Sequence, residues 1–277
     1  MISNEAITME SRKVLFVSQE ITPYLPENEL SLISRTLPQA IQETGKEIRT
    51  FMPKYGNINE RRNQLHEVIR LSGMNLIIDD TDHPLIIKVA SIQAARMQVY
   101  FIDNEEYFQR KHTVKDSKGK FFEDNDERMI FFARGVLETF RKLRWSPDLV
   151  HCHGWFTSLV PLYIKKAYRE DPLFADTKVV FSFYNHGFEE HLNPSFSDKI
   201  IIDGVSKDHV SMVNKAGYMN LVELATTYSD GLIKGSATLP ETVSGALKKT
   251  GKPFLDSVDE EKYVEEFSVF YDSIINK

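Results

Sequence analysis

The sequence has a single cysteine, and its first predicted strand-loop-helix stretch has no glycine. The chain of 277 residues has a single cysteine, Cys152, so an intramolecular disulfide framework is excluded. No glycine occurs between Lys13 and Thr44, the first stretch with the pattern of a strand, a loop and a helix. A dinucleotide fingerprint or a P-loop needs glycines at that turn, because the backbone must approach the phosphates closely. A nicotinamide oxidoreductase and a P-loop nucleotidase are therefore not expected.

Long apolar runs and an excess of basic charge are also missing. No apolar stretch approaches the ~20 residues needed to span a bilayer, and residues 1–13 lack the apolar core of a signal peptide. We therefore expect a cytoplasmic protein with no membrane partner. The net charge is −6 and no long basic run occurs, which argues against nucleic acid as a partner. The 42% of hydrophobic residues can bury the core of one large domain or two small ones.

Apolar runs alternate with helical patterns, which predicts an α/β fold with a parallel sheet. The runs that read as parallel strands are 13–18, 47–52, 149–153, 178–183 and 231–234. Between Leu65 and Phe101 the pattern changes to short alternating runs, which predict an inserted antiparallel meander whose last strand returns to the parallel sheet. These short runs are 68–71, 75–78, 85–89 and 97–101.

Three local signals carry further expectations. Pro38 lies inside the helical pattern of residues 30–41, so we expect a kink or a break there. Asp124 and Glu127 have the spacing of a capping box at the start of a helix. The acidic cluster at 79–84 reads as a turn, and its carboxylates lack the fixed spacing of a cation site.

The stretch from Leu143 to Tyr168 holds the densest group of chemically useful side chains. The run Leu149-Val150 ends in His151-Cys152-His153-Gly154-Trp155, and a helical pattern follows at once. This order predicts a strand that enters a helix through a tight turn. In an open α/β sheet, ligands bind outside the carboxyl ends of the strands, so two imidazoles and an indole lie where chemistry could occur.

Two interpretations of this group stay open, and a third is not favoured. A metal site is not favoured because adjacent side chains on a strand point to opposite faces and no partner with ligand spacing follows. In one interpretation His151 and His153 are satisfied histidines at a strand end, and Trp155 is a core residue. In the other, His153 faces a polar ligand as a neutral donor or acceptor.

Seven motifs, in order, resemble those of the bacterial glycogen synthases and starch synthases. They are a first strand closed by Ser-x-Glu (13–20), Leu-Pro-x-Ala (37–40), Pro-[KR]-Tyr-Gly (53–56), Tyr-Phe-x-Asp (100–103), Asp-Asn-x-x-Arg (124–128), Pro-Asp-x-Val-His-x-His-x-Trp (147–155) and the crossing toward a second domain (229–236). Each match alone is weak, but seven in register indicate kinship with this family.

The resemblance implies a retaining glucosyltransferase in which two Rossmann-like domains face each other across a cleft. This chain would supply one half of that GT-B fold: a flexible tail over 1–12, a Rossmann-like domain over 13–236 and closing helices of the same domain over 237–277. The resemblance also implies that His153 is catalytic and lies near the transferring sugar, without a cofactor or metal. The substrate-binding residues that it implies are Glu20, Asn125, His151, Trp155, Tyr184 and Asn185.

Departures from the family pattern fall at this site. The family's first loop reads Lys-Thr-Gly-Gly-Leu-Gly-Asp-Val, and its lysine and glycine amides approach the sugar nucleotide. Residues 26–33 read Pro-Glu-Asn-Glu-Leu-Ser-Leu-Ile, and the carboxylates of Glu27 and Glu29 would repel a diphosphate. Other replacements are Gly154 and Phe156 for an acid and a histidine, and Tyr184-Asn185 for His-Asn.

Three hypotheses about function follow. Because 41 residues follow Ser236, an enzyme moving glucose from ADP-glucose to an α-1,4-glucan would need a second chain to supply the nucleotide-binding half. A non-catalytic descendant would bind α-glucan, malto-oligosaccharide or a protein, with Trp155, Tyr24 and Tyr184 lining an apolar groove. A structural subunit would have neither pocket nor ligand. The lost phosphate-binding groups favour the second hypothesis, and the open cleft face predicts a dimer.

Overall fold

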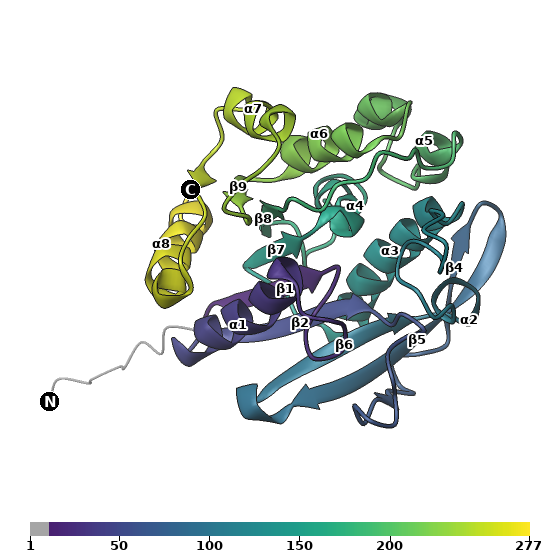
Figure 1. Cartoon of the computed structure of the whole chain (residues 1–277), viewed down its shortest axis with the longest axis horizontal. Coiled ribbons are helices and arrows are strands. Elements are labelled where there is room, and N and C mark those ends of the chain that lie inside the picture. The colour runs from purple at the N-terminus through teal and green to yellow at the C-terminus, as the bar shows by residue number, and fades with distance from the viewer. Residues whose placement is uncertain (1–10) are drawn as a thin grey trace, which may run out of the picture.

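A mixed sheet runs through residues 11–277, which are the residues that the computed structural model describes (Figure 1). Its strands are β1 (Lys13–Ser18), β2 (Glu47–Pro53), β3 (His66–Glu67), β4 (Met74–Ile78), β5 (Thr81–Ile92), β6 (Met97–Asp103), β7 (Leu149–His153), β8 (Lys178–Phe183), β9 (Gly231–Lys234) and β10 (Phe254–Leu255). The order is β10-β9-β8-β7-β1-β2-β6-β5-β3, and β4 pairs with β5. Neighbours from β10 to β6 are parallel, whereas β3, β4 and β6 pair with β5 antiparallel. The predicted α/β class and antiparallel insertion are confirmed.

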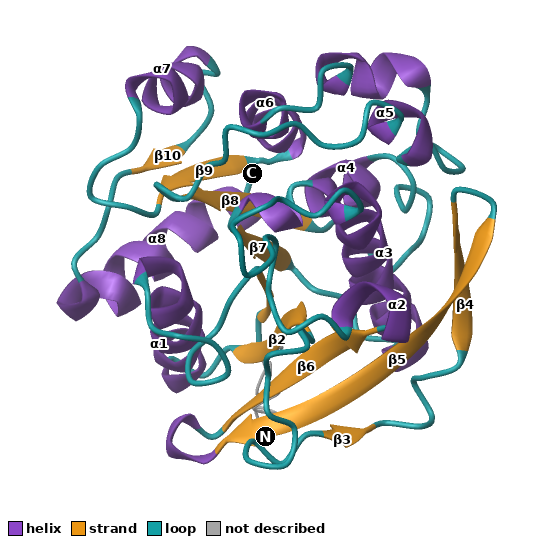
Figure 2. Cartoon of the chain, turned by 45° about the vertical axis from the view of Figure 1, so that its right-hand side comes forward, coloured by secondary structure: helices purple, strands orange, loops and turns teal. Residues whose placement is uncertain are grey.

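Helices cover both faces of the sheet (Figure 2). The α-helices are α1 (Glu29–Glu43), α2 (Glu105–Phe108), α3 (Asn125–Leu143), α4 (Leu159–Lys165), α5 (Phe196–Lys199), α6 (Tyr218–Tyr228), α7 (Glu241–Lys249) and α8 (Tyr263–Ile275). Short 3-10 helices are η1 (Gln93–Ala95), η2 (Trp155–Thr157), η3 (Lys207–Val213) and η4 (Glu260–Lys262). One hydrophobic cluster joins α1 and α8 to the sheet, and a larger cluster joins α3, α4 and α6 to the opposite face.

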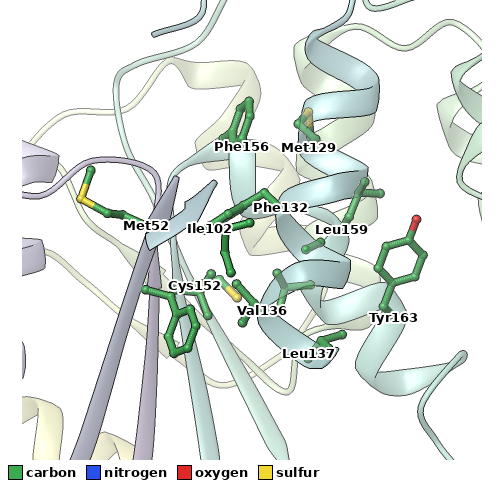
Figure 3. Close-up of a cluster of buried hydrophobic side chains, with 14 of the residues drawn as sticks. Met52, Ile102, Met129, Phe132, Val136, Leu137, Cys152, Phe156, Leu159 and Tyr163 are labelled. Carbon is green, nitrogen blue, oxygen red and sulfur yellow. The ribbon is translucent and has the colours of Figure 1, made fainter. Parts of the chain in front are cut away.

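Strand β1 shows why a central strand can read as a continuous apolar run. Val14 and Phe16 belong to the cluster under α1 and α8, while Leu15 and Val17 belong to the larger cluster. Figure 3 shows part of that larger cluster, where Cys152 of β7 lies beside Val136 of α3. Each fully buried aliphatic or aromatic side chain contributes about 1.5–3 kcal/mol to folding. A strand buried on both faces therefore reads as a continuous apolar run.

Helix α1 does not break at Pro38, contrary to one of the two outcomes expected from the sequence. The helix runs from Glu29 to Glu43 with Pro38 inside it. Pro38 is buried, as are Leu37 and Ile41 in the same helix. A proline in a helix interior costs about 3 kcal/mol, which the burial of the two aliphatic neighbours is large enough to offset.

The predicted capping box at the start of α3 is wrong. Asp124 is the N-cap residue, but its side chain makes no capping hydrogen bond. It pairs instead with the guanidinium of Arg110. Glu127 accepts a hydrogen bond from the Tyr107 hydroxyl at 3.0 Å and pairs with Lys199. Contacts with other elements therefore displaced the local hydrogen bonds that the spacing suggested.

The antiparallel insertion differs from its prediction in two places. Residues 68–71 form a turn, in which the Val68 carbonyl accepts from the amide of Leu71 at 2.9 Å, and the neighbouring Ile69 is 82% exposed. The hairpin turn after β4 consists of Asp79 and Asp80, with left-handed φ values of 49° and 59°. Strand β5 begins directly after it, because aspartate tolerates this conformation in a tight hairpin.

Residues 1–10 of the predicted tail lie outside the described residues. Of the two tail residues that are described, Arg12 pairs through its guanidinium with Asp148 at 3.1 Å. None of the helices in residues 11–277 combines the length and apolar character that a membrane crossing requires.

Candidate functional site

The carboxyl ends of β1, β7, β8 and β9 form the edge of the sheet where the predicted site residues gather. Strand β1 has β7 on one side and β2 on the other, so the chain changes direction across the sheet at β1. Ligands of open α/β sheets bind at such a switch point. Ser18 and His153 are partners in the register of β1 and β7, and Tyr184 follows β8 directly.

His151 and His153 form a buried, uncharged pair beneath this edge. Both side chains are 0% exposed, and their ring centroids lie 3.8 Å apart. Burial, with a smaller contribution from the other histidine, holds the pKa of His151 well below its ordinary value. Burial lowers the pKa of His153 to about 3. Neither imidazole is therefore a cation at neutral pH.

The two histidines differ in their hydrogen bonds. His151 uses both ring nitrogens, with Tyr271 Oη at 2.6 Å and Ser182 Oγ at 2.7 Å. It has no nitrogen left for a substrate, which corresponds to the interpretation of a satisfied strand-end histidine. His153 binds the Tyr184 hydroxyl through Nδ1 at 2.7 Å, while its buried Nε2 has no partner among the described residues.

Gly154 makes the tight turn that was predicted after β7. Its φ is 84°, a left-handed value that favours glycine. A Cβ atom at this position would lie 2.7 Å from a Leu30 methyl and 2.9 Å from the Gln19 side-chain oxygen. That Gln19 oxygen also accepts from the Phe156 amide at 3.2 Å. The loop after β1 and the start of α1 therefore pack directly on this turn.

The start of α1 is closed by polar contacts within the chain. Asn28 caps the helix by accepting from the Ser31 amide at 2.8 Å, and Ser31 Oγ accepts from the Asn28 amide at 2.9 Å. Glu20 accepts from the Asn28 side chain at 2.7 Å. The Glu29 carboxylate accepts from the hydroxyl of Ser236, which follows β9. A carboxylate thus lies in the first turn, where a helix N-terminus attracts anions.

The contact between Glu29 and Ser236 was not anticipated from the sequence. The two residues are 207 positions apart, and no local pattern links them. Ser236 Oγ also accepts from the amide of Asn185 at 3.0 Å. The ends of β8 and β9 are thereby joined to the start of α1 by one hydroxyl group.

Asn125, at the start of α3, has both side-chain amide atoms engaged within the protein. It is 0% exposed, its oxygen accepts from Arg128 at 2.7 Å, and its nitrogen donates to the Val114 carbonyl at 2.8 Å. The structure therefore does not present this side chain to a ligand in the cleft.

Three aromatic residues that were expected to line an open groove are buried instead. Trp155 and Tyr24 are 7% exposed and Tyr184 is 2% exposed. Trp155 and Tyr184 line a hollow of about 10 Å³, enough for a single water molecule. Trp155 packs on Phe188 with ring centroids 4.7 Å apart, as part of the core beneath the surface.

An open groove of about 670 Å³ lies beyond these buried rings. Its walls include the exposed Asn185 and the half-buried rings of Phe188 and Tyr218, whose centroids are 5.7 Å apart. Asn220, at the start of α6, also lines it, but its oxygen accepts from the Gly217 amide at 3.0 Å and its nitrogen donates to the Met212 carbonyl at 2.6 Å. The two aromatic faces and the exposed side-chain amide of Asn185 suit a ligand with apolar ring faces and many hydroxyls. Of the predicted residues, Asn185 is the one exposed in this groove.

No cluster within residues 11–277 has three or more histidine, cysteine, aspartate or glutamate side chains placed to hold a metal ion.

Comparisons with known proteins identify relatives of this chain. Residues 13–248 match the starch synthase catalytic domain. The glycogen synthase of Chlorobium limicola is 35% identical over 235 residues, which is 84% of this chain and 47% of the relative. That of Chlorobaculum tepidum is 36% identical over 255 residues, which is 87% of this chain and 51% of the relative. The chain spans about half the length of these curated relatives.

A solved structure supports the fold. The catalytic domain of starch synthase IV from Arabidopsis thaliana, bound to ADP and acarbose, superposes with a TM-score of 0.72 at 18% identity. The superposition covers 90% of this chain and 52% of that one. The sheet seen here is therefore that of one half of a GT-B fold. With a family match that covers most of its length, this chain belongs to the starch synthase catalytic domain family.

Proposed function

We propose that this chain binds α-glucan and does not itself transfer glucose. The observation that carries the proposal is the closure of the α1 start by Glu29, which accepts from the Ser236 hydroxyl and, at 3.4 Å, from the Ala237 amide. A diphosphate at this helix start would meet a carboxylate, with Glu20 nearby on Asn28. Losing such phosphate contacts costs several kcal/mol of transition-state stabilisation, on the order of 3–4 for a single donor.

Glucan binding would use the groove defined by Asn185, Phe188, Tyr218 and Asn220. Sugar rings present apolar faces that pack on aromatic side chains such as Phe188 and Tyr218, and their hydroxyls can pair with the exposed amide of Asn185. The volume of about 670 Å³ is sufficient for a short malto-oligosaccharide. Acarbose, an oligosaccharide analogue, is bound by the starch synthase IV domain that shares this fold.

A second candidate function is glucosyl transfer from ADP-glucose to an α-1,4-glucan, with the nucleotide-binding half supplied outside this sequence. Family membership supports it, as does the Nε2 atom of His153, which lacks a partner and could meet a polar group of a substrate. Because His153 is 0% exposed, this function requires the strand ends to open. Self-association through the cleft face stays a prediction, which sedimentation would test.

The deciding experiment measures incorporation of labelled glucose from ADP-glucose into malto-oligosaccharide, with the same oligosaccharide titrated by calorimetry. We expect binding without transfer. Transfer that is lost in His153→Ala would support the second candidate and contradict our reading of the α1 start. Absence of both binding and transfer would refute both functions and leave the structural hypothesis.

Aromatic truncation tests the location of the glucan groove. Phe188→Ala and Tyr218→Ala should each weaken malto-oligosaccharide binding about tenfold, because each removes a ring face from the groove. Phe254→Ala is the matched control, since that phenyl ring is also partly exposed, at 40%, but lies on the edge strand β10. Equal weakening by all three variants would mean that the groove does not hold the sugar.

A further inference from the structure

A second hollow, of about 540 Å³, lies at the opposite edge of the sheet from the candidate site. Lys46 directly precedes β2, and Arg96 directly precedes β6. Because β2 and β6 are parallel neighbours, both cations lie at the amino ends of the strands. Arg49, on β2, lines the same hollow. Two cations at the start of β2 and one before β6 thus converge on one place.

The charges of this hollow are poorly balanced within the protein. Lys46 and the guanidinium of Arg96 have no ion-pair or hydrogen-bond partner among residues 11–277, and Glu47 is the one carboxylate that lines the hollow. Glu47 is already engaged, since it accepts from the Trp145 indole at 2.6 Å and lies 3.7 Å from Arg49. In a chain with a net charge of −6, an excess of two positive charges in one hollow attracts an anion.

Arg49 is the fixed cation of the three. It donates to Tyr100 Oη at 2.8 Å and lies 5.3 Å from the centre of the Trp145 ring. Its Nε is buried and has no hydrogen-bond partner. The guanidinium is therefore already oriented before any ligand arrives, which lowers the entropy lost on binding.

The carboxyl end of α1 also lies at this hollow, and its partial negative charge opposes the binding of an anion. Its last carbonyls are occupied: that of Ile41 accepts from Thr44 Oγ1 at 2.7 Å, and that of Gln42 accepts from the Gly45 amide at 2.9 Å. The three side-chain cations therefore outweigh the partial charge of the helix end.

We infer that this hollow binds a small phosphate-bearing ligand. A phosphate dianion matches two unpaired cations, and the neutral side chains of Gln42, Ser91 and Gln98 could pair with hydroxyls of an attached sugar. The volume lies within the range of about 300–1,000 Å³ that small-molecule sites occupy. The inference does not depend on the proposed glucan groove, which lies at the other edge of the sheet.

Calorimetry at constant ionic strength tests the inference with inorganic phosphate, glucose 1-phosphate and glucose as probes. We expect saturable binding of at least one phosphate-bearing probe and none of glucose. Binding of inorganic phosphate but not of glucose 1-phosphate would identify a site for the free anion. Tighter binding of glucose 1-phosphate would show that the sugar hydroxyls are recognised. Both results support the inference. Saturation by glucose, or by no probe at concentrations on the order of 10 mM, would overturn it.

Charge-neutral variants locate the site. Lys46→Gln and Arg96→Gln should each weaken phosphate binding about tenfold or more, since each removes one of the unpaired cations. Arg62→Gln is the matched control, because Arg62 is also exposed and lacks an ion-pair partner among the described residues, but does not line the hollow. Equal weakening by Arg62→Gln would indicate general attraction of anions and refute a built site.

Discussion

At the scale of single residues, the buried histidine pair has the most direct consequence. His153 sits in β7 between the hydroxyl of Tyr184 and the ring of His151, with no carboxylate among its hydrogen-bond partners. A charged imidazole there would lose its hydration and face a second imidazole. The protein therefore keeps both rings neutral, and the unfolded chain binds protons more readily than the folded one.

This difference predicts loss of stability in acid. Between pH 6.5 and about 3, the unfolded chain protonates this histidine and the folded protein does not, so the free energy of unfolding falls as pH falls. For one histidine the slope is about 1.4 kcal/mol per pH unit, and His151 adds in the same direction. Urea unfolding from about pH 7 to about pH 4 would measure it.

The variant His153→Gln should flatten this slope by about one proton, because glutamine does not titrate. Val14→Ala is the control, since it removes buried side-chain volume from the cluster under α1 and α8 without removing a titratable group. An unchanged slope in His153→Gln would show that this histidine is not responsible for acid sensitivity.

At the scale of elements, strands with two buried faces could be predicted and contacts between distant elements could not. β1, β8 and β9 have the bounds that their apolar runs indicated, because burial on both faces leaves a simple signature. The turn at 68–71 was missed because four residues rich in aliphatic side chains resemble a short strand. The break that Pro38 allowed did not occur, and the capping box at the start of α3 was wrong, because burial and ion pairs there outweigh local rules.

The candidate site was likewise predictable in its position but not in its contacts between distant residues. Its position was predicted from strand order and the sequence at 151–155, and His153 and Asn185 lie at that edge. Whether each aromatic ring is buried or exposed was not predictable, because an aromatic residue looks the same in the sequence in the core and in a groove. The bond between Glu29 and Ser236 required the fold itself.

The cap of α1 supplies a test at this scale. Asn28→Ala should lower the free energy of unfolding by about 1 kcal/mol, because it removes an N-cap acceptor. Ser31→Ala should act similarly. The double variant should cost clearly less than the sum, since the two side chains complete one reciprocal capping box. Strict additivity in urea unfolding would contradict this account.

At the scale of the whole molecule, Lys199 ties the long connection between β8 and α6 to the rest of the fold. Its Nζ lies 3.2 Å from the buried Asp126 and pairs with Glu127, both in the first turn of α3. Burial raises the pKa of Asp126, and the lysine opposes that effect. The lysine side chain is itself only 6% exposed, so the pair is held away from solvent.

Lys199→Met should therefore lower the free energy of unfolding by about 3–5 kcal/mol, because it leaves a buried carboxylate without its cation. Lys207→Met is the matched control, since its partner Asp198 and the lysine itself are mostly exposed, at 67% and 82%. That control should cost less than about 1 kcal/mol. Similar losses for both variants in urea unfolding would rule out the special role of Lys199.

The buried position of Cys152 gives the molecule a practical property. The side chain is 0% exposed, burial raises the pKa of its thiol, and the sequence has no other cysteine. A thiol that is both enclosed and protonated reacts slowly with maleimides. A cysteine introduced at Met219, which is 38% exposed and lines the groove, would then be labelled alone in the unmodified protein. A fluorophore at that position could follow sugar entering the groove in real time.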